Sequence, residues 1–164
     1  MKHELDIAQK LQNLIPSHVM EVVAPRKGRV FLRVKKERLR EVIEFLKNEG
    51  FTHLSGITAL ETDDKFELLY HLGMEGTLLT VRVNLTLNND IAPTITDIFP
   101  GALLYEREAH DLFGVKFEGN PNMKPLILPE DWPENIYPMR KNGRIKGERP
   151  KKRQKSSRKK CNKC

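Results

Sequence analysis

The sequence predicts an α+β fold in which an antiparallel or mixed sheet packs with helices, followed by an extended proline-rich arm and a disordered basic tail. Several short segments alternate apolar and polar residues, others repeat apolar residues at helical spacing, and the composition changes twice towards the C-terminus. The predicted boundaries are residues 1–115 for the α/β domain, 116–143 for the arm and 144–164 for the tail. At 164 residues, the chain is long enough for one domain with its own core.

The domain is predicted to begin with a helix and two strands. Residues 4–14 carry apolar side chains on one helical face, and the helix ends near Pro16. Residues 19–23 and 28–34 alternate apolar and polar side chains, which is typical of strands. The residues between these two segments include a proline and a glycine, which favour a turn.

A second helix and an antiparallel meander are predicted next. Residues 38–48 place apolar residues at helical spacing, and Gly50 supplies a stop. Residues 51–61, 65–72 and 77–87 read as three strands joined by short turns. We expect one face of the resulting sheet to be solvated and the other to be covered by helices.

The densest cluster of charged residues follows the predicted sheet. A helix is predicted over residues 103–113, because Pro100 and Gly101 precede it and Gly114 follows it. Within it, residues 106–111 comprise three acids, an arginine and a histidine. Four-residue spacing places Arg107 with Asp111, and Glu106 with His110, on common faces. Spacing alone leaves two interpretations open, a solvated helix face or an interface with another protein.

The wider pattern around this helix favours the interface. It resembles the 30-kilodalton subunit family of respiratory complex I, and more closely the homologous subunit of membrane-bound energy-converting (group 4 nickel-iron) hydrogenases and related archaeal complexes. Residues in register with the family pattern before and within the helix are Pro93, Thr96, Phe99, Pro100, Ala102, Glu106, Arg107, Glu108, Asp111, Phe113 and Gly114. The resemblance covers residues 20–143 and continues through Phe117, Gly119, Pro121, Leu126, Leu128, Pro138, Met139, Arg140 and Lys141. The chain departs from it at Leu104, Asn120 and Asn142.

The resemblance implies a cofactor-free accessory subunit of a membrane-associated oxidoreductase. Its implied partners are a large hydrogenase-like subunit of the quinone-site type, a small iron–sulfur subunit and membrane subunits. Nickel-iron and/or iron–sulfur centres would lie in those partners. The chain itself would be a peripheral subunit on the cytoplasmic face of the cell membrane, held there by the partners. Charged pairing with the large subunit is assigned to Glu106, Arg107, Glu108 and Asp111. The other interface residues would be Phe113, Gly114, Phe117, Pro121, Trp132, Tyr137, Arg140 and Lys141.

The predicted arm keeps large apolar side chains although five prolines exclude long regular elements. An extended segment of this kind is usually buried against something. It could pack on its own domain, but the resemblance favours an arm laid along the large subunit. Trp132 and Tyr137 are the natural anchors, since aromatic residues dominate interface energetics.

The tail carries most of the positive charge. Residues 144–164 hold eleven Lys or Arg and one acid, whereas the remaining residues hold 18 bases and 21 acids. A disordered tail of this kind could be solvated, dock on an acidic partner, contact anionic lipid or bind nucleic acid. Nucleic acid is the least favoured of these, because no aromatic residues interleave for base stacking.

The chain shows no motif of an active site. It lacks a phosphate loop, a dinucleotide fingerprint and a helical zinc-binding histidine pair. Cys161 and Cys164 have metal-ligand spacing, but a closed zinc site needs four ligands, so they are weak candidates for a metal or a redox pair. No apolar run is long enough to cross a bilayer.

Overall fold

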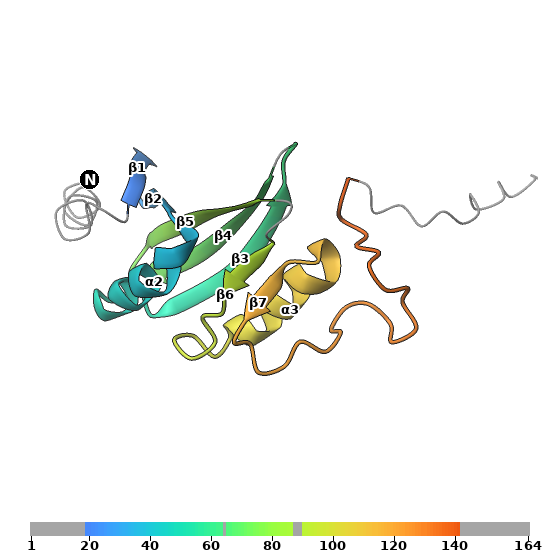
Figure 1. Cartoon of the computed structure of the whole chain (residues 1–164). Coiled ribbons are helices and arrows are strands. Elements are labelled where there is room, and N and C mark those ends of the chain that lie inside the picture. The colour runs from blue at the N-terminus through green and yellow to red at the C-terminus, as the bar shows by residue number, and fades with distance from the viewer. Residues whose placement is uncertain (1–18, 64, 87–89, 142–164) are drawn as a thin grey trace, which may run out of the picture.

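The computed structural model describes residues 19–63, 65–86 and 90–141. Its centre is a five-stranded sheet in the order β1-β2-β5-β4-β3 (Figure 1). The strands are β1 (Val19–Arg26), β2 (Arg29–Val34), β3 (His53–Glu61), β4 (Lys65–Met74) and β5 (Thr77–Thr86). Neighbouring strands are antiparallel except β2 and β5, which are parallel. The sheet is therefore mixed.

One face of the sheet forms the core. In the central strands the register pairs Leu72 with Leu79 and Tyr70 with Val81, and all four side chains are fully buried. The residues alternating with them, such as Arg82 on β5, lie on the opposite face, where Arg82 forms an ion pair with Glu67 at 3.3 Å. This alternation fixes the register, because a slip of one residue would move the apolar set to the wrong face.

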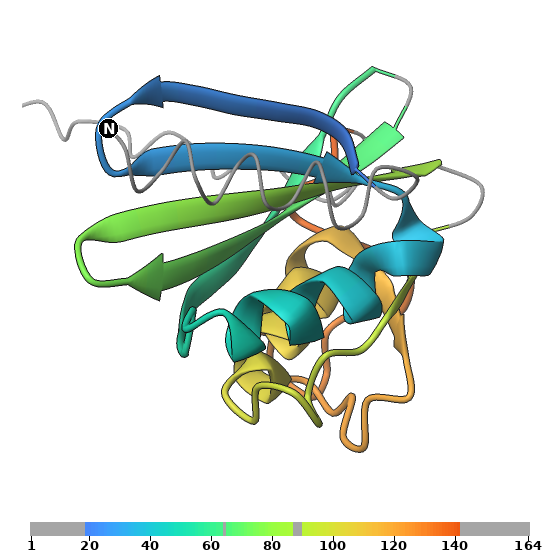
Figure 2. The same cartoon turned by 90° about the vertical axis from the view of Figure 1, so that its left-hand side faces the viewer.

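Two helices cover the core face (Figure 2). A short 3₁₀ helix, η1 (Lys36–Arg38), leads into α2 (Leu39–Asn48), whose buried residues are Leu39, Val42, Ile43 and Leu46. These are the apolar residues that predict a helix from their spacing. Helix α3 (Ala102–Phe113) packs against β3. In Figure 2 both helices lie on the same side of the sheet.

A small second sheet joins the domain to the arm. Strand β6 (Ile91–Pro93) pairs in parallel with β7 (Lys116–Glu118), so the first residues of the predicted arm belong to regular structure. Residues 119–141 contain no helix or strand. They run from β7 along α3 and then outward past it, as the orange part of the trace shows in Figure 1.

The predicted fold class is confirmed. The second predicted helix, the meander and the third helix appear within a few residues of their expected bounds. The prediction allowed either an antiparallel or a mixed sheet. The parallel pairing of β2 with β5 makes the sheet mixed. The predicted helix at residues 4–14 and the tail lie outside the described residues.

Candidate partner-binding site on helix α3 and the arm

Helix α3 ends at Phe113 because Gly114 adopts a left-handed conformation. Its φ is +73°, which favours glycine, and its backbone N–H donates to the carbonyl of His110 at 2.7 Å. A Cβ atom at this position would also overlap the ring of Tyr137, which belongs to the arm. Gly114 therefore both ends the helix and allows the arm to approach it closely, as expected for Phe113-Gly114 at the helix end.

Glu106 lies in the interior and has no exposed surface. Its Oε2 accepts hydrogen bonds from the Thr94 hydroxyl at 2.7 Å and from the Asn120 amide at 2.7 Å. Its Oε1 accepts from the backbone N–H of Ile95 at 2.9 Å. The carboxylate thus joins the segment after β6, helix α3 and the start of the arm.

Burial raises the pKa of the Glu106 carboxyl above its usual value of 4.5. Its three hydrogen bonds and the positive charge of Arg40 act in the opposite direction, because they favour the ionised form. A buried carboxylate that keeps three donors is costly to replace, since each donor would be left without a partner.

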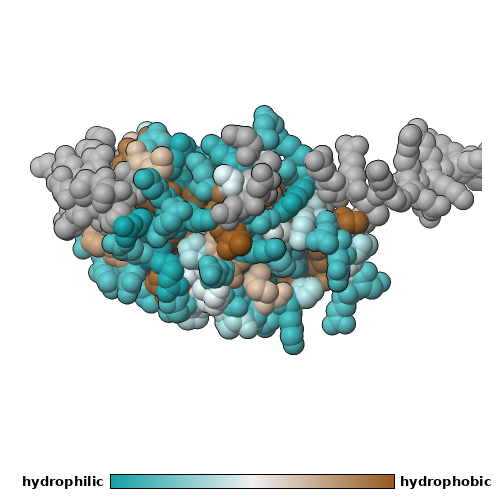
Figure 3. All heavy atoms as spheres, viewed as in Figure 1, coloured by the Kyte–Doolittle hydropathy of each residue, from teal (hydrophilic) through white to brown (hydrophobic). Residues whose placement is uncertain are grey.

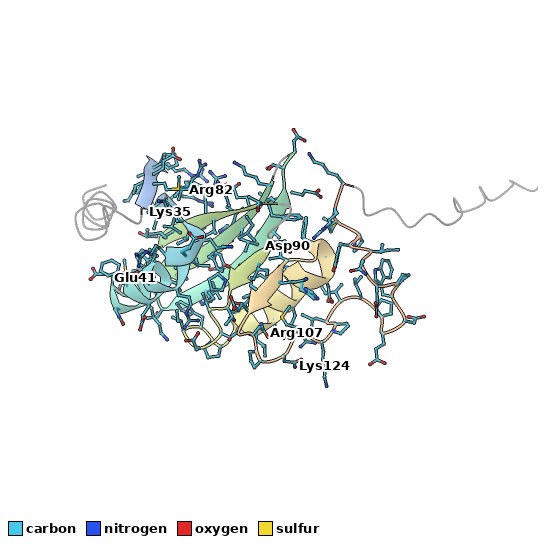
Figure 4. All side chains as sticks on the ribbon, in the orientation of Figure 1. Lys35, Glu41, Arg82, Asp90, Arg107 and Lys124 are labelled. Atoms are coloured by element: carbon cyan, nitrogen blue, oxygen red, sulfur yellow. The ribbon has the colours of Figure 1, made fainter. Side chains whose placement is uncertain are left out.

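Asp111 and Arg107 hold the backbone of the arm. Asp111 Oδ2 accepts from three consecutive backbone N–H groups of residues 126–128, at 2.7, 2.9 and 3.3 Å. One helical turn earlier, Arg107 donates to the carbonyls of Lys124 at 2.7 Å and Pro125 at 2.8 Å. Figure 4 shows Arg107 on α3 next to Lys124 of the arm. A segment that cannot form a sheet or helix has its backbone groups satisfied by one helix face.

The four-residue pairs predicted on this helix do not bind each other in the described part of the chain. Arg107 and Asp111 both turn to the arm, and His110 Nδ1 lies 3.0 Å from the carbonyl oxygen of Val115 instead of contacting Glu106. Glu108 is half-buried. The charged cluster is thus used largely within the chain, and its direct pairing with another subunit stays a prediction.

The far end of the arm is fastened by Arg140. Its Nε donates to the carbonyl of Phe113 at 2.5 Å, and another guanidinium nitrogen lies 3.1 Å from a carboxylate oxygen of Asp90. The same guanidinium lies over two aromatic rings, 4.8 Å from the centroid of Phe66 and 4.6 Å from that of Tyr137. This end of the arm is therefore bound to the sheet as well as to α3.

The residues on either side of Arg140 add to this attachment. The backbone N–H of Met139 donates to the carbonyl of Leu112 at 3.1 Å. Lys141 donates its backbone N–H to Glu61 at 2.7 Å and pairs through its side chain with Asp63. Arg140 and Lys141, predicted as interface residues, thus make their contacts in this chain with their own domain.

Between these two attachments the arm makes a loop, residues 129–136, which we call the arm loop. The Trp132 indole N–H donates to the carbonyl of Ile136 at 2.7 Å, and the Trp132 backbone N–H donates to the carbonyl of Pro129 at 3.0 Å. An open recess of about 280 Å³ lies between the arm loop and α3. Besides residues of the arm loop, it is lined by His110 and Asp111 of α3 and by Tyr137. Trp132 and Tyr137, predicted as anchors, both face this recess.

Comparison with known proteins decides the family. The family model described as respiratory-chain NADH dehydrogenase, 30 Kd subunit, matches residues 32–149. The chain belongs to this family. The resemblance seen in the charged motif is therefore confirmed.

Relatives in this family come from more than one type of complex. Membrane-bound hydrogenase subunit beta of Pyrococcus furiosus is 31% identical over 142 residues, covering 82% of this chain and 82% of that protein. A longer polypeptide of the NADH-quinone oxidoreductase of Escherichia coli O6:K15:H31 is 32% identical over 151 residues, covering 81% of this chain but 24% of that protein. A chain in the solved structure of the membrane-bound sulfane sulfur reductase, an archaeal respiratory membrane complex, matches with a TM-score of 0.77 and 32% identity, covering 88% of this chain and 87% of that one.

The arm of this family member exposes large apolar side chains. Leu126, Ile127 and Met139 are 41%, 52% and 57% exposed, and Leu104 on α3 is 51% exposed. On the face shown in Figure 3 the surface is mostly hydrophilic, and hydrophobic residues form separate spots. The arm is therefore attached through its backbone and polar groups, while several of its apolar groups point outward.

Of the remaining predicted interface residues, some are buried and some are exposed. Phe113 and Phe117 are buried in the domain, and Pro121 is exposed. Cys161 and Cys164 lie outside the described residues. In the described ranges, no group of three or more His, Cys, Asp or Glu side chains could hold a metal ion. Nor does any helix in those ranges have the length and apolarity needed to cross a membrane.

Sequence reasoning missed several residues that build the site. Thr94 and Asn120 complete the hydrogen bonds of Glu106, and Asp90 completes those of Arg140. Asn120 is one of the departures from the family pattern, and its amide serves as a donor to the buried carboxylate. The sequence did hold a signal for these contacts. A proline-rich arm has backbone groups that need hydrogen-bond partners, and the nearest dense set of charged side chains in the sequence is on α3.

Proposed function

We propose that this chain is an accessory subunit of a membrane-associated oxidoreductase of the complex I or energy-converting hydrogenase type. Its role is to bind the large catalytic subunit through the arm and to stabilise the junction where electron transfer is coupled to ion translocation. The chain itself carries no cofactor in this proposal, and the redox centres belong to its partners. It would be a peripheral subunit on the cytoplasmic face, held there by the other subunits.

The observation that carries this proposal is the construction of the arm. Asp111 and Arg107 bind its backbone, and Arg140 of the arm binds the Phe113 carbonyl at the end of α3, so the shape of the arm is set before any partner arrives. Its side chains Leu126 and Ile127 remain exposed. A preformed segment that presents apolar groups loses little conformational entropy on binding, which favours docking on another protein.

The longer relative supports a large partner. This chain matches 24% of the length of the Escherichia coli NADH-quinone oxidoreductase polypeptide, so there a region like this chain is joined to a further polypeptide. Covalent joining keeps the two regions close together. A separate chain of the same family would need a non-covalent surface for the same purpose, and the arm supplies one.

The proposal is tested by tagging the full chain in its own host, solubilising the membranes gently and identifying copurifying proteins by mass spectrometry. We expect stoichiometric recovery of a hydrogenase-like large subunit together with iron–sulfur and membrane proteins. Recovery of the chain alone, or with ribosomes or DNA-binding proteins, would contradict the proposal and favour nucleic-acid binding through the basic tail.

A variant of Arg107 connects this test to the arm. Arg107→Glu removes the donors for two arm carbonyls, so we expect release of the subunit from the complex while circular dichroism shows a folded domain. Arg38→Glu makes the same change of charge at an exposed ion pair with Glu41 and serves as the control. Normal assembly of the Arg107 variant would count against the arm as the attachment.

A further inference from the structure

The recess behind the arm loop has walls of a particular chemistry. It has a volume of about 280 Å³, and its aromatic walls are Trp132 and Tyr137. Its acidic groups are Asp111, Glu130 and Glu134, the imidazole of His110 lies beside them, and none of the lysines or arginines that the structure describes lines it. Glu130 and Glu134 are exposed at its rim. The recess is therefore acidic and aromatic.

Asp111 supplies a hydrogen-bond acceptor to this recess. The residue is only 5% exposed, and its Oδ2 takes all three bonds from the arm backbone. Its other oxygen, Oδ1, accepts no hydrogen bond from the residues that the structure describes. A carboxylate oxygen that is open to the recess can accept hydrogen bonds from a ligand that brings donors.

A guanidinium group matches these walls best. Aromatic faces attract cations, and carboxylates add charge-assisted hydrogen bonds. The planar guanidinium can stack on a ring and donate to two carboxylate oxygens together, whereas an ammonium group acts as a single point charge. Within the chain, the Tyr137 ring already contacts one guanidinium group, that of Arg140, 4.6 Å from the ring centroid.

Resting on the proposed function, we infer that the recess binds an arginine side chain presented by the large partner subunit. The recess is continuous with the exposed apolar residues of the arm, because Asp111 lines the recess and binds the backbone of Leu126 and Ile127. A partner that covers these two side chains would also reach the recess, because Pro125 and Leu128 on either side of them line it. The arginine would then be desolvated, which strengthens its interaction with the carboxylates and the rings.

The isolated full chain allows a direct test, because Trp132 is its only tryptophan. Titration with N-acetylarginine amide is followed by Trp132 fluorescence, and the neutral isostere N-acetylcitrulline amide is the matched ligand. We expect a saturable change with the arginine probe and none with citrulline. The double variant Glu130→Gln/Glu134→Gln should weaken the response about tenfold.

The variant Glu37→Gln/Glu118→Gln makes the same change of net charge at exposed positions that do not line the recess. It should respond like the wild type. An equal fluorescence change with arginine and citrulline would overturn the inference. A fluorescence change caused by KCl alone, present in the wild type and absent in Glu130→Gln/Glu134→Gln, would assign the recess to the chain's own basic tail and would also overturn it.

The purified complex separates this inference from the proposed function. We expect the Glu130→Gln/Glu134→Gln complex to release the large subunit at a lower KCl concentration than the wild-type and Glu37→Gln/Glu118→Gln complexes. Equal salt tolerance of an assembled complex would refute the arginine site and leave the accessory role standing. Failure of the wild-type chain to recover a large subunit would instead refute the accessory role itself.

Discussion

The sheet and the arm of this chain are held in place by different interactions. In the sheet, buried apolar side chains such as Leu72 and Leu79 pack between strands and helices. In the arm, polar side chains of α3 bind backbone groups, and Leu126 and Ile127 remain exposed. The sheet is thus stabilised by burying its own apolar groups. The arm is shaped by its contacts with the domain, and several of its apolar side chains stay exposed.

The largest effect is expected from damage to the sheet. Leu72→Ala removes a fully buried side chain from strand β4, and such a cavity costs about 2–5 kcal/mol. Urea unfolding should show a lower free energy of unfolding for the whole domain. Leu60→Ala, on the neighbouring strand but 41% exposed, is the control. A loss for Leu72→Ala no larger than for Leu60→Ala would break the comparison, because apolar burial would then not support the sheet.

A smaller and more local effect is expected in the arm. Asp111→Ala leaves three backbone N–H groups of residues 126–128 without their acceptor, at a cost of about 1–3 kcal/mol. Hydrogen exchange of these three amides should become faster, while amides of the central strands stay protected. Asp131→Ala, an exposed acid of the same arm, is the control. Equal loss of protection in the sheet would show that the arm and the sheet form one cooperative unit.

Glu106 lies at the boundary between the two regions, and its effect depends on pH. Its pKa is raised in the folded chain, so the folded state binds the proton more tightly than the unfolded state does. The stability that Glu106 contributes is therefore fully present below the unfolded value of about 4.5 and is lost as pH rises through the folded pKa. We expect the free energy of unfolding of the wild type, relative to Glu106→Gln, to fall as pH rises through this window.

This difference in the free energy of unfolding between the wild type and Glu106→Gln is measured by urea unfolding. The pH range runs from roughly 4 to roughly 7. Glu37→Gln, at an exposed position of η1, is carried through the same series as the control. A difference that grows with pH would mean that the hydrogen bonds from Thr94, Ile95 and Asn120 outweigh burial in setting the pKa.

The sheet was largely predictable from the sequence, and the reason is local. Alternation in residues 65–72 and 77–87 reports which side chains face the core, and short turns make antiparallel neighbours of consecutive strands. The parallel pairing of β2 with β5 joins strands far apart in the sequence, with a helix and two strands between them. No local pattern encodes such a pairing.

The helix face that carries the charged residues was predictable, but the contacts that these residues make were not. The spacing of Arg107 and Asp111 correctly indicated one helix face, yet it could not show that this face binds the backbone of residues 124–128. Side-chain spacing reports neighbours within a helix, whereas the acceptors and donors of the arm come from its backbone and leave no residue-specific trace. The inward position of Glu106 likewise follows from tertiary packing against Thr94 and Asn120.

The central claim is that the exposed apolar residues of the arm bind the large subunit. It is tested by comparing Leu126→Ser/Ile127→Ser with Leu60→Ser/Ile91→Ser in copurification from the host. Both variants remove one leucine and one isoleucine of similar exposure: 41% and 52% in the arm, 41% and 40% elsewhere. We predict that both remain folded and that only the arm variant loses the large subunit. Retention of the large subunit by the arm variant, or equal loss in both, would contradict this account.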